Sequence, residues 1–423
     1  MRETGFKGIG LCNLANAGPM ECNFDDWLRQ SIGIGDDWSI DSANFRMNPP
    51  ALDVGVSFCG RPVCPVCGKE CPGYDKRQRV WRDLDFGGSR CNIAADFPRI
   101  RCREHGIREI EIPWVGKTSK LTLAFEQACL RYARVMPVRL ASELLDVSES
   151  TIWRIVKHTA DMRMRELDLS RMTRFCIDET SYRKGHRYVT SVVDPDTGAV
   201  VFMTLGKDAS AMAEFRTWLI HHGGDPHRIE VISCDMGKAY IAGAKEYFPE
   251  ATVCFDHFHV VKLANDALDK VRKQVGFKGA KGRGIRFWLM RNREDLGDEK
   301  KSVIDVLSDQ YDDLGTVYSV KEALRDMYRL PDRESAMRFI FMIIDRCLDS
   351  ENDTIFTLGL SLDEHIHGIL AWFDKRISNG RAEGVNSVIQ AVKRTARGFA
   401  NPENMIAVTY LRNLRKNGLE LST

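Results

Sequence analysis

The strongest constraint on the fold of this 423-residue chain is a change of hydrophobic pattern after Met172. From there on, short apolar runs with the length of buried strands follow one another closely. We predict strands at Thr173–Asp178, Tyr188–Val193 and Ala199–Leu205, with a turn at Asp194–Gly198. Because short turns join antiparallel neighbours, these three strands form a meander in our interpretation.

This predicted meander is followed by an alternation of helices and strands. We expect helices at Ser210–His221 and Lys238–Tyr247, strands at Ile229–Cys234 and Thr252–Phe255, and a helix beginning at His259. Three antiparallel strands followed by this alternation favour an α/β fold with a ribonuclease-H-like layout over a doubly wound parallel sheet.

The other segments indicate further parts of the chain. Residues 260–375 are almost continuously helical in pattern, and a loop at Ser378–Gly380 precedes a last amphipathic helix from Arg381 to Arg397. We expect a loose leader at 1–23, a cysteine-containing module at 24–113, a helical region at 114–170, an α/β domain formed by 171–260 and 376–415, and a helical insertion at 261–375.

Composition limits the class of protein. The 61 Lys and Arg residues nearly balance the 59 Asp and Glu residues, so the net charge of +2 excludes a histone-like packing protein but allows a nucleic-acid enzyme. No apolar run is long enough to span a membrane, and the N-terminus lacks the apolar stretch of a secretion signal. Several of the 13 cysteines lie in apolar strand-like runs, so we expect reduced thiols and a cytoplasmic protein.

Two short cysteine motifs predict a metal site. Cys64 and Cys67 are separated by two residues and followed by Gly68, and Cys102 and His105 repeat this spacing downstream. Two such knuckles supply the four ligands of a tetrahedral structural Zn²⁺ ion, and they leave no position for a substrate.

Cys71 and Cys91 are competing ligands in this prediction. The alternative is a set of unrelated thiols or one redox-active pair. Two knuckles, each followed by glycine, make that alternative less favourable than zinc.

The segment 137–158 has the pattern of a helix-turn-helix. Leu140, Leu144 and Leu145 give a first short helix an apolar face, the small Ala141 lies where two helices approach, and the turn is at Asp146–Val147. Ser148 then caps a second helix, whose Ile152 and Ile155 pack back on the first.

The second helix leaves four polar side chains for a DNA groove or its phosphates: Ser150, Thr151, Arg154 and Lys157. The alternative is an ordinary helical hairpin. A neighbouring zinc module favours DNA binding, because both are devices for holding DNA.

Acidic residues end two of the predicted strands. Asp178 closes Phe175–Asp178, and Asp235 closes Val231–Asp235. If the two strands are neighbours, their carboxylates meet at one edge of the sheet and repel unless a hard divalent cation such as Mg²⁺ neutralises them.

A third carboxylate, Glu383, lies in the first turn of the helix from Arg381, with Asn386 one turn further on the same face. Lys393, Arg394 and Arg397 add positive charge that suits a DNA backbone. Each acidic residue alone is more often a turn or cap residue. The three together favour a catalytic site.

The motifs together resemble the DDE transposases of bacterial insertion sequences, in the ISL-three group. The resemblance runs from about Phe24 to about Arg415 and is carried by these segments: Cys64–Gly68, Arg101–Gly106, the helix-turn-helix, Ile177–Thr180, Cys234–Met236, Asp256–Lys262 and Ser378–Asn386. It implies a ribonuclease-H-like catalytic domain in which Asp178, Asp235 and Glu383 are the acidic triad, with the helical insertion before Glu383. Asp256 and His259, with Asn386, are expected at most to support the site.

The resemblance implies a transposase that binds double-stranded DNA at terminal inverted repeats, as at least a dimer, and uses two Mg²⁺ or Mn²⁺ ions for strand cleavage and transfer. It also implies a nucleoid-associated location. Two alternatives are a ribonuclease-H-like nuclease that cuts without joining, and a DNA-binding regulator that uses only the zinc and helix-turn-helix modules.

Overall fold

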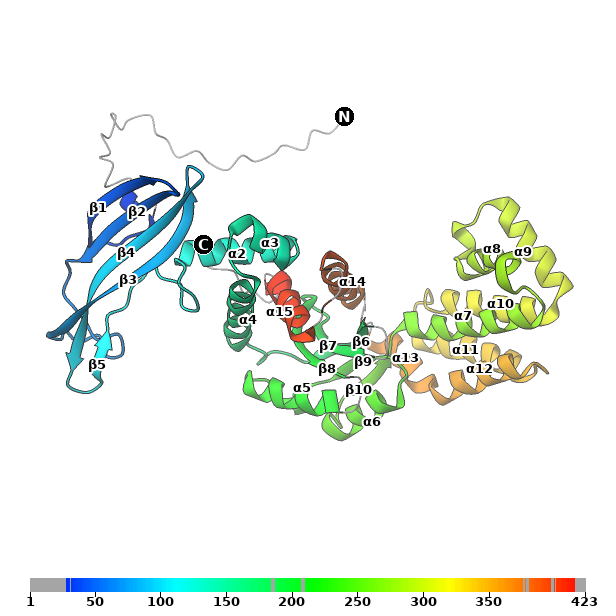
Figure 1. Cartoon of the computed structure of the whole chain (residues 1–423). Coiled ribbons are helices and arrows are strands. Elements are labelled where there is room, and N and C mark those ends of the chain that lie inside the picture. Colours follow the sequence, from blue (N-terminus) through cyan, green and yellow to red (C-terminus); the bar gives the residue numbers. More distant parts are fainter. Residues whose placement is uncertain are drawn as a thin grey trace, which may run out of the picture. The chain divides into compact units, whose positions relative to one another are not determined.

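The computed structural model describes residues 28–183, 187–206, 210–375, 377, 380–396, 399 and 401–414, apart from Ser31 and the side chains of 280, 281, 381–383, 385 and 386 (Figure 1). The expected leader at 1–23 lies outside these residues. The chain divides into two compact units, one ending at Ile155 and one beginning at Val156. The boundary falls inside a helix, α4 (Glu149–Arg165).

The first unit contains a five-stranded sheet. Its strands are β1 (Trp38–Met47), β2 (Pro50–Phe58), β3 (Gly73–Phe86), β4 (Ser89–Cys102) and β5 (Gly106–Glu109). The order is β1-β2-β4-β3, with β5 added to β4. Strands β3 and β4, of 14 residues each, form a long antiparallel hairpin.

Three tryptophans build the core under this sheet. Trp114 packs edge-on against Trp38 and Trp81, with ring centroids 5.8 and 5.5 Å apart. All three are nearly inaccessible to solvent. The module therefore has a hydrophobic core of its own beside its cysteine knuckles. Two helices follow it before α4, namely α2 (Leu123–Val135) and α3 (Val138–Leu145).

The second unit contains the predicted α/β sheet. Its strands are β6 (Arg174–Arg183), β7 (Arg187–Asp194), β8 (Ala199–Leu205), β9 (Val231–Cys234) and β10 (Thr252–Phe255). Strands β6, β7 and β8 form the antiparallel meander, while β9 and β10 add parallel to β6, giving the order β10-β9-β6-β7-β8. The ribonuclease-H-like prediction is thereby confirmed.

Helices cover both faces of this sheet. Figure 1 shows α5 (Ser210–His221) and α6 (Lys238–Tyr247) on one face, and α14 (Gly380–Thr395) and α15 (Pro402–Asn413) on the other. On the α5 side, Phe175 packs edge-on against Phe215 and Phe248, with centroids 4.7 and 5.3 Å apart. A short 3₁₀ turn, η1 (Pro226–Arg228), precedes β9.

The helical insertion is present as a bundle. It consists of α7 (His257–Gln274), α8 (Gly279–Met290), η2 (Arg293–Asp295), α9 (Asp298–Gln310), α10 (Asp312–Met327), α11 (Arg333–Leu348), α12 (Asp353–Glu364) and α13 (Ile366–Lys375). The last of these returns to the sheet, because a Cβ on Gly368 of α13 would lie 2.4 Å from the Phe255 ring of β10.

The helix α15 is an addition to the predicted elements, which ended with the helix from Arg381. It begins at the cap residue Asn401, whose side chain accepts a hydrogen bond from the Glu403 N–H. Near its end, Asn413 Oδ1 accepts the Val200 N–H of β8 at 2.8 Å. Across the described ranges, every helix is too short or too polar to cross a bilayer.

Candidate functional site

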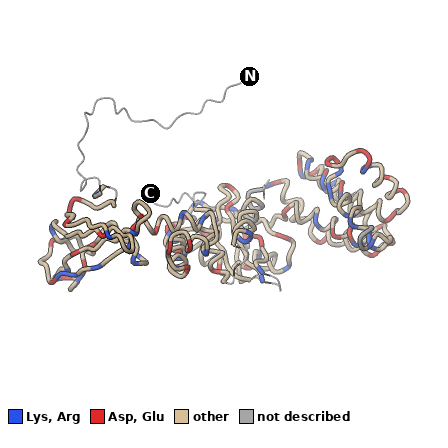
Figure 2. Tube along the Cα trace, turned by 45° about the horizontal axis from the view of Figure 1, so that its top comes forward, with Lys and Arg blue, Asp and Glu red and all other residues tan. Residues whose placement is uncertain are grey.

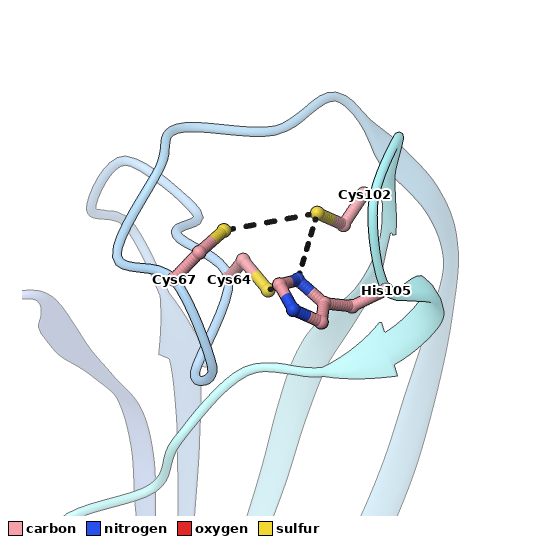
Figure 3. A group of neighbouring side chains, drawn as sticks. All are labelled: Cys64, Cys67, Cys102 and His105. Carbon is pink, nitrogen blue, oxygen red and sulfur yellow. Dashed lines mark hydrogen bonds between the residues drawn. The ribbon is translucent and has the colours of Figure 1, made fainter.

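Four predicted metal ligands come together in the first unit. Figure 3 shows Cys64 and Cys67 from the loop between β2 and β3, facing Cys102 at the end of β4 and His105 before β5. Their ligand atoms all lie within 4.8 Å of one another, and they form the one group of at least three metal-binding side chains found among the described residues.

The distances in this cluster match a tetrahedral zinc site. The Sγ atoms of Cys67 and Cys102 are 3.8 Å apart, and His105 Nδ1 is 3.5 Å from Cys102 Sγ and 3.7 Å from Cys64 Sγ. Ligands at about 2.3 Å (sulfur) and 2.0–2.1 Å (nitrogen) from one zinc ion stand roughly 3.8 and 3.5 Å apart. The donor set and the geometry therefore both fit zinc.

The backbone prepares the thiols for metal binding. Gly68 and Gly106 have φ of 69° and 70°, the left-handed conformation that lets each knuckle turn back. Backbone N–H groups of His105 and Glu104 hydrogen-bond to Cys102 and lower its thiol pKa to about 7. Thiolate is the form that binds the metal.

The two competing cysteines lie outside the four-residue group. Cys71 donates its thiol to the Lys69 carbonyl at 3.3 Å. Burial raises the pKa of Cys91 to about 12, so its thiol stays protonated, and it packs as an apolar side chain. The structure thus favours Cys64, Cys67, Cys102 and His105 as the zinc ligands.

The helix-turn-helix has its turn where the sequence places it. Asp146 has φ of 49°, and the hydroxyl of Ser148 accepts the Thr151 N–H at 3.3 Å as a helix cap. Ala141, Ile152 and Ile155 are at most 1% exposed. The prediction that Leu140, Leu144 and Leu145 form the apolar face of the first helix is wrong in part. Leu140 and Leu144 are exposed, while Val138 and Ala141 are the buried residues of α3.

The side chains predicted to contact DNA differ in availability. Ser150 and Arg154 are exposed and Thr151 is half-buried. In the second unit, Lys157 forms an ion pair with Glu403 of α15, with 2.8 Å between Nζ and Oε2. Figure 2 shows basic and acidic residues interspersed along the described trace, so any DNA surface must be built from local basic groups.

The two strand aspartates belong to neighbouring parallel strands. The register of β6 and β9 pairs Phe175 with Ile232 and Cys176 with Ser233. Continued by two residues, past the end of β9 at Cys234, this register would place Asp178 beside Asp235. Side chains alternate along a strand, so Asp178 lies on the face opposite Phe175, which packs under α5, and the continued register would place Asp235 on that same face.

One detail of the strand prediction is wrong. Asp178 does not end its strand, because β6 continues to Arg183. Beyond Cys176, however, β6 pairs only with β7, since β9 ends at Cys234. Asp178 therefore lies two residues beyond the last pair of β6 with β9.

Each carboxylate also has a local backbone partner. Asp178 Oδ1 accepts the Glu179 N–H at 2.7 Å, and Asp235 Oδ1 accepts the Gly237 N–H at 2.8 Å. A Cβ on Gly237 would lie 2.8 Å from Asp235 Oδ1, so glycine allows this close turn. These hydrogen bonds orient the two carboxylates.

The predicted supporting pair has two separate roles. Asp256 is 6% exposed and caps α7 by accepting the Phe258 N–H at 3.1 Å, which starts that helix at His257. His259, one turn into α7, places Nε2 4.0 Å from Asp178 Oδ1. The structure therefore brings His259 to Asp178, while the Asp256 side chain stabilises the strand-to-helix junction.

The side chain of Glu383, the third predicted carboxylate, lies outside the described residues. The same holds for the side chain of Asn386 and for the whole of Arg397. Their helix α14 is linked to β6, because Lys393 Nζ donates to the Ser181 carbonyl at 2.7 Å. Arg394 is exposed. Lys393 thus connects the helix that carries Glu383 to the strand that carries Asp178.

One charged partner was absent from the sequence predictions. Glu403, which pairs with Lys157, lies in the first turn of α15. The signal that could have revealed it is Asn401-Pro402-Glu403, a cap residue followed by proline and an acidic first turn.

Comparison with known proteins agrees with the order of these parts. Residues 60–105 match the zinc finger of transposases IS204/IS1001/IS1096/IS1165, and residues 110–160 match the helix-turn-helix domain of transposase family ISL3. Residues 175–409 match a family described as transposase.

Curated relatives extend the likeness over most of the chain. The transposase for insertion sequence element IS1557 of Mycobacterium tuberculosis is 28% identical over 382 residues, covering 82% of this chain and 85% of the relative. The transposase for insertion sequence element IS1001 of Bordetella parapertussis is 26% identical over 391 residues, covering 90% and 96%.

Proposed function

Because this chain belongs to the ISL3 family of transposases, we propose that it binds the terminal inverted repeats of an insertion sequence and catalyses metal-dependent DNA strand cleavage and strand transfer. The observation that supports the proposal is the parallel pairing of β6 with β9 as far as Cys176 and Ser233; continued by two residues, this register would place Asp178 and Asp235 on one face of the sheet. His259 lies 4.0 Å from Asp178 on the same side.

In this proposal Asp178, Asp235 and Glu383 hold two Mg²⁺ ions, or Mn²⁺ in their place, beyond the last pair of β6 with β9. When bound, such ions lower the pKa of a water and stabilise the departing 3′ oxygen of a phosphodiester. Hard cations of this kind prefer carboxylate oxygens. Lys393, through its hydrogen bond to Ser181, holds the Glu383 helix against β6. Asn386 supports the site from the same helix.

The reaction has two steps in this proposal. First, water attacks a phosphodiester at the element end, and the P–O bond to the 3′ oxygen breaks, releasing a 3′-hydroxyl. That hydroxyl then attacks a phosphodiester of target DNA, forming one P–O bond and breaking another. Neither step requires a covalent intermediate with the protein.

The N-terminal parts recognise DNA in this proposal. Cys64, Cys67, Cys102 and His105 bind a structural Zn²⁺ ion, and Ser150, Thr151 and Arg154 contact the inverted repeat. Lys157, Arg394 and Arg397 add basic contacts, together with Lys393. The two ends of the insertion sequence must be brought together, so a dimer or larger assembly forms on DNA in the nucleoid. The segments expected at 24–113, at 114–170, at 171–260 with 376–415, and at 261–375 serve as its functional domains.

The test is cleavage of a labelled duplex that carries the inverted repeat flanking the coding region, with Mg²⁺ present. We expect the wild type to yield both cut and strand-joined products. Glu383→Gln and Asp235→Asn should lose cutting by several orders of magnitude while retaining DNA binding, because each removes a metal-binding charge. Exposed Glu351→Gln is the matched control.

Three outcomes would contradict parts of the proposal. Undiminished cutting by Glu383→Gln removes Glu383 from the site. Cut DNA without any joined species identifies a nuclease of the same fold. Specific DNA binding without metal-dependent cutting by the wild type identifies a regulator.

A further inference from the structure

A cavity of about 590 Å³ lies within the first unit, between the sheet and the helix-turn-helix. Its walls come from β3, from the loop before α2 and from the beginning of α4. The lining residues on which the inference depends are Arg82, Lys117, Lys120, Asp146, Thr151 and Arg154. Thr151 and Arg154 are also predicted DNA contacts, so the cavity borders the expected DNA surface.

Arg82 holds two walls of this cavity in place. Its backbone N–H donates to the Lys120 carbonyl at 3.0 Å, and its carbonyl accepts the Thr122 N–H at 2.9 Å. Its side chain reaches the other wall, where Nη1 donates to the Asp146 carbonyl at 2.5 Å. The loop and the helix-turn-helix turn are therefore fixed relative to each other.

The cavity is strongly cationic. The one acidic side chain in its lining, Asp146, forms ion pairs with Arg90 and with Arg82. Lys117, Lys120 and Arg154 are exposed, and within the described part of the chain none of these three forms an ion pair. Three cationic groups thus remain available for an anion.

A buried carboxylate fixes the loop that carries the two lysines. Glu126 is 7% exposed, and its Oε1 accepts the Thr118 hydroxyl at 3.0 Å and the Ser119 hydroxyl at 2.6 Å. A Cβ on Gly116 would lie 2.4 Å from Glu126 Cδ, so glycine is required for the loop to pass. This arrangement preorganises the lysines, because Glu126 holds the loop between them.

We propose that this cavity binds a phosphodiester group of the DNA backbone, with Lys117, Lys120 and Arg154 contacting the phosphate. The site rests on the proposed DNA binding and adds to it an anchor that orients α4 on the duplex. Backbone contacts of this kind set the register of a recognition helix, although they read no bases themselves. Glu126 is a positioning residue for the anchor.

The test is the salt dependence of binding to a fluorescent 30-base-pair duplex of arbitrary sequence by the full chain. Each phosphate contact contributes about 0.9 to the slope of log K against log salt concentration. Lys117→Gln/Lys120→Gln should therefore reduce the magnitude of that slope by about 2. The matched control, Arg61→Gln/Lys76→Gln, removes two exposed cations that do not line the cavity.

Glu126 is tested by a pair of variants. Glu126→Ala frees the loop and should reduce the slope, whereas Glu126→Gln keeps the accepting oxygen and should restore it. Equal zinc content and equal unfolding temperature for Lys117→Gln/Lys120→Gln and the wild type show that the fold is intact.

Two results would overturn the anchor. The proposed phosphate anchor is overturned if the slope of log K against log salt concentration is unchanged in Lys117→Gln/Lys120→Gln, or falls no more than in the control variant. The proposed DNA binding would remain in place. A wild type with no salt-dependent duplex binding overturns the proposed function together with the anchor.

Discussion

The Sγ atom of Cys67 lies 3.8 Å from the Sγ atom of Cys102, the separation of two thiolates bound to one tetrahedral zinc ion. Cys67 belongs to the loop before β3, and Cys102 is the last residue of β4. The proposed ion therefore closes the open end of the long β3–β4 hairpin, opposite its turn at Gly87 and Gly88.

Removal of this ion should destabilise the first unit. We expect Cys102→Ser, or treatment with a chelator, to abolish zinc binding. The free energy of unfolding should fall by at least about 3 kcal/mol, because an ion that binds only the folded chain stabilises it by about this much when present at 100 times its Kd. Zinc content by mass spectrometry and urea unfolding measure this. Cys59→Ser changes an exposed thiol outside the cluster and should retain one zinc per chain. A zinc-free wild type with unchanged stability would contradict the prediction.

Packing of α13 on the sheet gives a second prediction. A Cβ on Gly368 would lie 2.4 Å from Phe255 Cε2. We expect Gly368→Ala to destabilise the second unit by about 1–3 kcal/mol, because overpacking forces the helix away from β10. Phe255→Leu in the same chain should recover part of this loss.

The control for this prediction is Gly284→Ala in α8, where an added Cβ meets nothing within 4 Å. It should raise the free energy of unfolding by up to about 1 kcal/mol, because alanine favours the helix. Urea unfolding of the two units, monitored by circular dichroism, measures the free energy of unfolding of Gly368→Ala and of Gly284→Ala. Destabilisation by both alanines alike would disprove the close contact.

The order of the α/β sheet could be predicted because its strands are short, continuously apolar and separated by clear turns. The end of β6 could not be predicted, because the residues after Asp178 are polar and pair only with β7. Helix α15 was missed for a related reason. Among its buried residues are Thr409 and Asn413, which hydrogen-bond to Met405 and to β8 and interrupt the apolar pattern that a sequence shows.

The candidate sites differ in the same way. The zinc ligands could be predicted because their spacing is local, and the Asp178–Asp235 relation followed from assuming adjacent parallel strands. The predicted leucine face of α3 was wrong in part, because Leu140 and Leu144 are exposed, while Ala141 is the fully buried residue of that helix. The ion pair of Lys157 with Glu403 could not be predicted, because Glu403 lies far away in sequence. The triad assignment of Glu383 stays a prediction.

The capping role of Asp256 gives a third prediction. Its carboxylate accepts the Phe258 N–H at the start of α7. Asp256→Ala should lower the free energy of unfolding by about 1 kcal/mol, and Asp256→Asn should retain most of the cap. Urea unfolding measures the stability, and DNA cleavage is measured separately. A cleavage defect in Asp256→Asn at unchanged stability would show instead that the negative charge acts in the active site.

A last prediction concerns acid sensitivity of the helical insertion. Burial tends to raise the pKa of Asp269, but hydrogen bonds from Lys273, Arg272 and Arg286 outweigh it and lower that pKa to about 2. Arg272 itself lies in the last turn of α7, is 4% exposed and donates to the Phe277 carbonyl, which precedes α8. Asp269 therefore neutralises a buried guanidinium.

The sign follows from the direction of the shift. Because the pKa is lower in the folded chain than the usual value of about 3.9, the ion pairs stabilise the fold fully above pH 4. That stabilisation, roughly 2 kcal/mol in its pH-dependent part, is lost as pH falls from about 4 to about 2. The difference in unfolding free energy between the wild type and Asp269→Asn should be constant from pH 5 to 7 and shrink below pH 4. Asp266→Asn, on the exposed side of the same helix, serves as the control. A difference that stays constant down to pH 2 would show that the Asp269 carboxylate does not stabilise Arg272 through its charge.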